Sequence, residues 1–213
     1  MRASFDRQLD SLRGRLVWMA ASAASAIRWA NLCLFSADLT VAGQVLDAAD
    51  ELTQARRSVE YRTFELLATQ QPVASDLRLA WAGVQVVGDL DRMGVLAAHI
   101  AKTMVRRHPT PVVASPLVDV VRAMAAIAER LAWDLARLLE LNDPRLSAAI
   151  VRADDEMDGL MRRLFQVVLT DWSFGVAAAI DAVQTGRFYE RFADHTVSAA
   201  RHVEFLITGQ RPG

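Results

Sequence analysis

Apolar residues recur along most of the chain at steps of three and four positions, a spacing that places them on one face of a helix. Four such stripes are Val45, Ala49, Leu52, Val59 and Leu66; Leu79, Val86, Leu90, Met93, Ala97 and Ile100; Ile150, Met157, Met161, Leu164 and Val168; and Tyr189, Phe192, Ala199, Val203 and Leu206. No segment alternates with the two-residue period of a strand for long enough to compete. The pattern therefore predicts an all-α protein.

Capping and helix-breaking residues divide this pattern into six segments. Breaks fall at residues 35–38, 70–72, 108–116, 142–144 and 171–173. We expect Ser36 or Asp38 to cap the second helix, Asp143 to cap the fifth with Pro144 in its first turn, and Ser173 to cap the sixth. The proline of the second break disfavours a helical conformation at the residue before it, so a helix ends there. Long helices with short connections favour antiparallel bundles.

The two halves of the chain resemble each other. Residues 45–53 align with residues 150–158, and residues 91–94 align with residues 190–193. A tandem duplication of a three-helix unit explains both matches, and the proline-rich stretch 109–116 is the natural linker. We predict two tandem antiparallel three-helix bundles related by internal duplication, the first over residues 1–108 and the second over residues 117–213.

Composition and charge exclude several classes of protein. With 53% hydrophobic residues, the chain is too apolar to be disordered. Its 24 basic and 25 acidic residues give a formal charge of -1, which argues against a nucleic-acid-binding protein. The single cysteine, Cys33, excludes an internal disulfide and a zinc site built from cysteine pairs.

The N-terminal segment loosely resembles a signal peptide, because arginines precede an alanine-rich apolar stretch at residues 16–26. Asp6 and Asp10 interrupt its basic region, and the apolar spacing continues through Ile27 and Leu34, as in one long amphipathic helix. No window approaches the roughly 20 apolar residues of a membrane span. We therefore expect a cytoplasmic protein.

Two pairs of acidic residues in the second half stand four positions apart. Asp154 and Asp158 form one pair, and Glu190 and Asp194 form the other. Residues at this spacing share a helix face, so each pair presents two carboxylates together. On one interpretation they are solvated groups in surface ion pairs worth under about 1 kcal/mol each. On the other, two such pairs on facing helices form a site for hard metal ions.

The first half keeps only one of these four acids. The aligned positions hold Ala49, Thr53, Asp91 and Val95. Any metal chemistry should therefore be confined to the second half.

The sequence does not indicate an enzyme. The metalloprotease, nucleophile-elbow, P-loop and dinucleotide-binding motifs are absent, and no Glu has a His three residues later as a di-iron bundle requires. His195 directly follows Asp194, and adjacent helical residues diverge too far to bind one ion easily. For His99 and His202 we expect ordinary packing roles.

Three motifs carry a resemblance to a known family. QQPVASDLR at residues 70–78, the Asp-x-x-x-Asp motif at residues 154–158, and YERFADH at residues 189–195 resemble the helix junction, acidic motif and signature of the PhoU family. The resemblance implies a cytoplasmic, all-α protein that often dimerises. It also implies a role in down-regulating phosphate-starvation signalling, by linking the phosphate ABC importer to a membrane sensor histidine kinase. Some family members carry multinuclear iron or other metals on helix carboxylates.

We therefore expect a non-enzymatic negative regulator and adaptor. Its partners would be the ATPase subunit of the phosphate importer, the sensor histidine kinase and a second copy of the chain, with membranes reached only through partners. The expected metal ligands are Asp154, Asp158, Glu190 and Asp194, holding Fe, Mn, Zn or Mg. The alternative is a metal-binding or metal-storing helical protein with an indirect effect on phosphate. A membrane-surface scaffold is disfavoured, because the first helix lacks a basic polar face.

Overall fold

The computed structural model describes residues 2–69, 74–170 and 172–210. These residues form helices and connecting loops without any strand, which confirms the all-α prediction. The helices are α1 (Arg2–Ser36), α2 (Leu39–Thr69), α3 (Ala74–Arg107), α4 (Val118–Leu141), α5 (Pro144–Thr170) and α6 (Gly175–Thr208), with a short 3-10 helix η1 (Ser115–Leu117) before α4.

Two of the predicted helix starts carry the expected caps. The backbone N–H groups of Thr40 and Val41 donate to Asp38 Oδ1 at 2.8 and 3.2 Å, so Asp38 caps α2. At α5, the N–H of Arg145 donates to Asp143 Oδ1 at 3.0 Å, and Pro144 is the first helical residue. These side chains satisfy N–H groups that have no partner within the helix.

Two further breaks differ from prediction or lie outside the described residues. Ser173 does not cap α6, because the helix begins at Gly175 with Phe174 at the capping position and no side-chain hydrogen bond. The indole N–H of Trp172 instead donates to the carbonyl of Gly175 at 2.7 Å. The predicted break at residues 70–72 lies outside the described residues.

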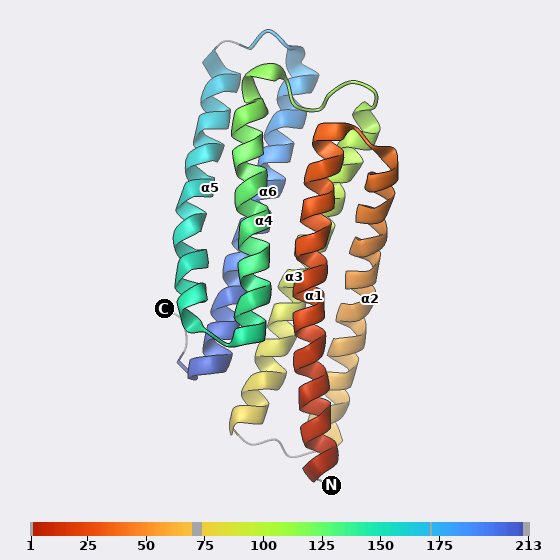
Figure 1. Ribbon diagram of the computed structural model, residues 1–213, viewed down its shortest axis with the longest axis vertical. Coiled ribbons are helices and arrows are strands. Elements are labelled where there is room, and N and C mark those ends of the chain that lie inside the picture. Colours follow the sequence, from red (N-terminus) through yellow and green to blue (C-terminus); the bar gives the residue numbers. More distant parts are fainter. Residues whose placement is uncertain (1, 70–73, 171, 211–213) are drawn as a thin grey trace.

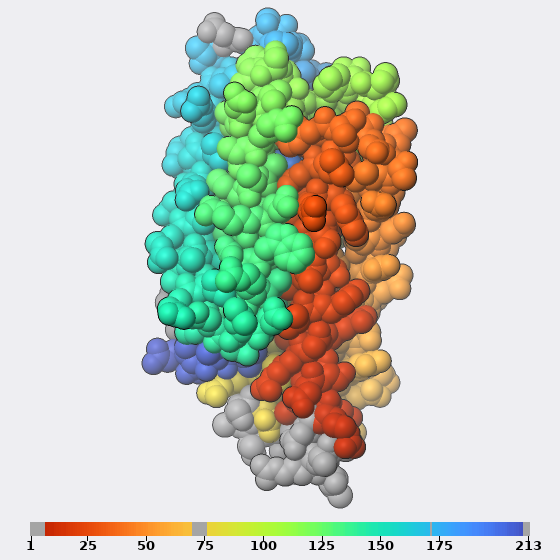
Figure 2. Space-filling model, in the orientation of Figure 1, coloured from red at the N-terminus to blue at the C-terminus, as the bar shows by residue number. Residues whose placement is uncertain are grey.

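The six helices form two antiparallel three-helix bundles that lie side by side (Figure 1). Helices α1 and α3 of the first bundle face α4 and α6 of the second, while α2 and α5 lie at the two flanks. Figure 2 shows α1 and α4 meeting along one face of the molecule. This arrangement confirms the predicted tandem bundles.

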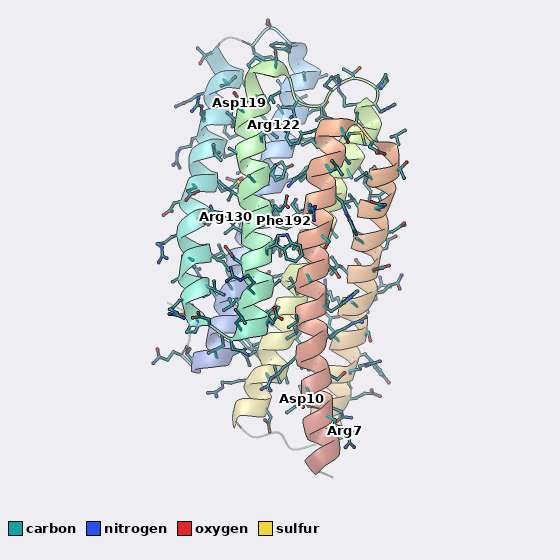
Figure 3. All side chains as sticks on the ribbon, viewed as in Figure 1. Arg7, Asp10, Asp119, Arg122, Arg130 and Phe192 are labelled. Carbon is teal, nitrogen blue, oxygen red and sulfur yellow. The ribbon has the colours of Figure 1, made fainter. Side chains whose placement is uncertain are left out.

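The core is continuous across the two bundles. Helices α3 and α6 make the most extensive helix–helix contact in the described part of the chain. Alanines such as Ala23, Ala24 and Ala30 on α1 are fully buried and let neighbouring helices approach closely. Phe192 of α6 is also fully buried and lies in the middle of the molecule (Figure 3). The halves are therefore not separately packed bodies.

Buried polar contacts also tie the halves together. The Tyr189 hydroxyl on α6 donates to Asn31 Oδ1 on α1 at 2.8 Å, and Asn31 Nδ2 donates to the carbonyl of Ala125 on α4 at 3.1 Å. Near one end, the buried carboxylate of Asp181 on α6 binds Arg106 of α3, with Nη2 and Oδ1 2.6 Å apart. No described helix has the length and hydropathy to cross a membrane.

Candidate functional site: an acidic cluster on α5 and α6

Helices α5 and α6 bury their apolar stripes and leave acidic residues along the edges of those stripes. On α5, Met157 is fully buried, Asp154 beside it is half-buried, and Asp158 is exposed. On α6, Glu190 is half-buried and Asp194 is exposed. The position of Asp154 at the edge of the core follows from its place beside the apolar stripe of the sequence.

The pKa values of Asp154 and Asp194 are raised by the charges of neighbouring carboxylates. The pKa of Asp154 is raised from 3.8 to about 6, first by burial and then by the negative charges of Asp194, Asp158 and Asp155. Arg201 opposes the increase. The structure therefore brings the acidic pair of α5 close to that of α6.

Asp194, on α6, belongs to the same acidic cluster as Asp154 and Asp158 of α5. Its pKa is raised by desolvation first, then by the charges of Glu190 and Asp158, while His195 and Arg191 act in the opposite direction. Glu190 forms an ion pair with Arg187 one helical turn earlier. Desolvation and like charges thus act together on the acids of both helices.

The chemistry of these donors suits hard cations. Carboxylate oxygens are the preferred ligands of Mg²⁺, Mn²⁺ and iron, whereas Zn²⁺ favours His and Cys. Among the described residues, however, no group of three His, Cys, Asp or Glu side chains converges on a common point that could hold a metal ion. The metal-ligand role of Asp154, Asp158, Glu190 and Asp194 therefore stays a prediction.

The equivalent region of the first bundle has a different arrangement. Asp91 on α3, which aligns with Glu190, is buried and accepts a hydrogen bond from the Thr53 hydroxyl of α2 at 2.6 Å. Arg56 donates to its other oxygen at 3.0 Å, and Arg56 also binds Glu60 at 2.8 Å. Basic and acidic groups alternate here, so the charge of Asp91 is compensated.

Close packing fills the space around this ion-pair network. A Cβ atom placed on Gly94 would lie 2.7 Å from Leu52 Cδ1, so α2 and α3 approach closely at this level. Ala49 of α2 is also buried, and its Cα would lie 3.6 Å from the same Cβ position. Ala49 and Thr53 thus belong to a packed helix interface, and neither they nor Val95 offer a carboxylate.

A further group of polar residues lies between the halves. Asp89 of α3 contacts two histidines of α6, with 3.0 Å to His195 Nδ1 and 4.0 Å to His202 Nε2. His99 stacks on Phe188 at a centroid distance of 5.2 Å, and burial followed by the charge of Lys102 lowers its pKa. His99 is exposed, and the ordinary packing role expected for it stays a prediction.

Residue spacing along the chain does not predict the Asp89–His195 contact. It joins residues in different halves, and only their three-dimensional packing brings them together. Beside it, Arg92, Arg191, Glu190 and Asp194 line a hollow of about 590 Å³ between α3 and α6. The Glu190–Asp194 pair of α6 thus faces the boundary between the two bundles, whereas Asp154 and Asp158 do not line this hollow.

Comparison with known families gives a match over most of the chain. The model described as "PhoU domain" matches twice, at residues 16–104 and 121–203. These two matches agree with the internal duplication seen in the sequence and in the paired bundles.

Individual proteins match over the full length. The phosphate-specific transport system accessory protein PhoU homolog 1 of Mycobacterium leprae is 41% identical over 213 residues, covering 100% of this chain and 96% of that protein. PhoU homolog 2 of Mycobacterium tuberculosis is 40% identical over 213 residues, covering 100% of both.

Solved structures share the fold. The crystal structure of PhoU from Pseudomonas aeruginosa superimposes with a TM-score of 0.85 at 24% identity, covering 97% of this chain and 100% of that chain. The phosphate transport system regulatory protein PhoU from Streptococcus pneumoniae gives a TM-score of 0.83 at 21% identity, covering 98% and 99% of the two chains.

Proposed function

The chain belongs to the PhoU family, and we propose that it is a cytoplasmic negative regulator of phosphate-starvation signalling that acts as an adaptor. Its partners would be the ATPase subunit of the phosphate importer and a sensor histidine kinase. The observation that carries this proposal is the full-length identity of about 40% to accessory proteins of the phosphate-specific transport system. We propose no catalytic step, because the family is one of accessory and regulatory proteins.

The shape of the molecule supports an adaptor role. The C-terminal ends of α2 and α5 lie at opposite ends of the molecule (Figure 1). Near the end of α2, Tyr61 and Phe64 are exposed; near the end of α5, Leu169 and, at the start of α6, Val176 are exposed, with 81% of the Leu169 surface accessible. Exposed apolar surfaces often mark protein interaction sites. Two such surfaces at opposite ends would let one molecule hold two partners.

Regulation of a kinase in this way requires unequal binding to its two output states. An adaptor shifts a conformational equilibrium only to the extent that it binds one state more tightly than the other. We propose that this chain binds the phosphatase state of the kinase preferentially when phosphate is abundant. A homodimer would present each docking surface twice.

Capture experiments with both partners test the adaptor role. The purified chain is mixed with the importer ATPase subunit and with the cytoplasmic region of the kinase, in phosphate-replete buffer. We expect both to be captured. Failure of both to bind would remove the adaptor role.

Two variants then test the two ends separately. We expect Phe64→Asp and Leu169→Asp each to lose one partner and to retain the other, so that each variant is the folding control for the other. Loss of both partners in a folded variant would contradict separate docking ends.

A second role, binding of a divalent or ferric metal ion, is favoured by the mutual repulsion of the acidic cluster. Asp154, Asp158, Glu190 and Asp194 would supply the oxygen ligands, and a bound cation would neutralise the charges that raise the pKa of Asp154. Their oxygen chemistry fits iron, Mn²⁺ or Mg²⁺ better than Zn²⁺.

Elemental analysis tests the metal role. We expect the double variant Glu190→Ala/Asp194→Ala to lose the metal content of the wild type. The control is Asp47→Ala/Asp50→Ala, which removes two exposed acids from α2 in the first bundle. Equal metal content in all three proteins would exclude this site.

A further inference from the structure

A hollow between α1 and α2 has no role in the proposed function. It lies in the first bundle, along the part of α1 around and beyond Asp10 (Figure 3), and its volume is about 630 Å³. Ligand sites in proteins typically enclose about 300–1,000 Å³. Small residues on both helices leave the space open: Gly14 and Ser11 on α1 and Ser58 on α2 all line it. A Cβ atom added to Gly14 would meet no atom within 4 Å.

One residue that lines this hollow has a buried hydroxyl without a partner. Thr63 of α2 is 3% exposed, and its Oγ1 forms no hydrogen bond with any described residue. Threonines in helices usually donate to the carbonyl four residues earlier. In this structure, that bond is formed by Thr69, Thr103, Thr170, Thr185, Thr196 and Thr208. Thr63 is an exception on the same helix as Thr69, and a buried hydroxyl left unpaired is destabilising.

The remaining polar lining is rich in hydrogen-bond donors and positive charge. Arg15 of α1 and Arg62 of α2 both line the hollow, and neither forms an ion pair with a described residue. The Arg15 guanidinium lies over the ring of Trp18, 4.3 Å from its centroid. Glu65 is the one acid among the described lining residues, and it already accepts a hydrogen bond from the Tyr61 hydroxyl.

We propose that this hollow binds a phosphate-bearing small molecule. Two unpaired guanidinium groups from facing helices match the oxygens of a phosphate group, and the Thr63 hydroxyl would gain the partner that it lacks. The volume exceeds that needed by a single inorganic phosphate, and the Trp18 ring offers an apolar wall, so an organic phosphate of nucleotide size suits the space. This site lies in the opposite bundle from the acidic cluster and does not depend on the adaptor role.

Calorimetric titration of the full chain tests the proposal. The probes are adenosine monophosphate, ribose 5-phosphate and inorganic phosphate, with adenosine as the uncharged control. We expect the phosphate-bearing probes to bind and adenosine not to bind. We expect Arg62→Gln to weaken binding about tenfold or more, because a charge-assisted hydrogen bond is lost. The matched control is Arg57→Gln, an exposed arginine on the same helix outside the hollow, which should stay within about twofold of the wild type.

A second variant separates binding from stability. Thr63→Val keeps the shape of the side chain and removes the unpaired hydroxyl. We expect its melting temperature without ligand to be equal to or higher than that of the wild type, while its affinity falls. A residue with only a structural role would not combine these two effects.

One outcome of these titrations would identify the source of the ligand, and two would overturn the proposal. If inorganic phosphate binds as tightly as the two organic probes, the source of the ligand is free phosphate and the chemical class stands. If no phosphate-bearing probe binds at millimolar concentration, the proposal is overturned. It is also overturned if folded Arg62→Gln binds as the wild type does, because the site would then lie elsewhere.

Discussion

Asp91 and Glu190 occupy equivalent positions in the two bundles but have opposite surroundings. Asp91 is buried, accepts a hydrogen bond from Thr53 and pairs with Arg56. Glu190 lies beside Asp194, whose pKa is raised partly by the charge of Glu190. The same duplicated scaffold therefore uses one carboxylate to join two helices and leaves the other among like charges.

The difference can be traced to two neighbouring positions. Where the first bundle has Thr53, a hydroxyl donor, the second has Asp158, another acid. Where the first has Arg56, the second has the buried Met161. The second bundle thus lacks both compensating groups, and it also has Asp154 and Asp194 where the first bundle has Ala49 and Val95, so a repulsive cluster stands in place of an ion-pair network. Four substitutions test this contrast, in order of decreasing effect.

The largest effect is expected from Asp91→Ala. It removes both hydrogen bonds at Asp91 and leaves Arg56 and Thr53 without that partner, so we expect a loss of about 2–3 kcal/mol in the free energy of unfolding. Denaturant titration monitored by circular dichroism measures it. A loss below about 1 kcal/mol would mean that Asp91 contributes little more than a surface ion pair.

A smaller loss is expected from Tyr189→Phe. The equivalent residue of the first bundle is the apolar Leu90, so the Tyr189 hydroxyl is specific to the second bundle. Its removal leaves Asn31 Oδ1 without this buried donor, and we expect a loss of about 1–2 kcal/mol in the same titration. Tyr61→Phe is the control, because the Tyr61 side chain is exposed; equal effects of both variants would contradict the prediction.

Asp154→Asn should stabilise the protein, and more so at high pH. The pKa of Asp154 is higher in the folded state than in the unfolded state, so its ionisation costs stability as the pH rises from 3.8 through about 6. After allowance for solvent screening, we expect a gain of about 1 kcal/mol at pH 8 and a smaller gain at pH 5. Urea unfolding at both pH values measures it, with the exposed neighbour variant Asp155→Asn as control. A gain that does not depend on pH would show that charge is not the cause.

The smallest effect is expected from Glu190→Ala. It removes an exposed ion pair with Arg187 and relieves repulsion from Asp194, and these effects oppose each other. We expect a change within about 0.5 kcal/mol in the unfolding free energy. This variant is the direct counterpart of Asp91→Ala, so similar losses in both would abolish the contrast between the bundles.

The fold could be predicted from sequence because its determinants are local. The apolar stripes, Asp38, Asp143 and Pro144 each act within a few residues, and the duplication appears as two aligned segments. Ser173 failed as a cap because α6 begins at Gly175, which moves the capping position one residue on, to Phe174. The side-by-side packing of α3 on α6 depends on surfaces from both halves, which local spacing does not specify.

The site could be predicted only in part. Four-residue spacing placed Asp154 with Asp158 and Glu190 with Asp194, and the structure brings the two pairs near each other. The contact of Asp89 with His195 could not be predicted, since no spacing rule links positions in different bundles. The same holds for the hollow around Thr63, which depends on how α1 and α2 separate.

The shared core between α3 and α6 has a consequence for the history of the duplication. A single three-helix unit would expose this apolar face to water, and its simplest cover would be a second identical unit related by a twofold axis. Fusion of two such units into one polypeptide makes their association independent of concentration and also frees them from having identical sequences. Each half can then change its residues while the other half maintains the shared packing. This explains how the equivalent positions of the two halves can hold Ala49 in one and Asp154 in the other.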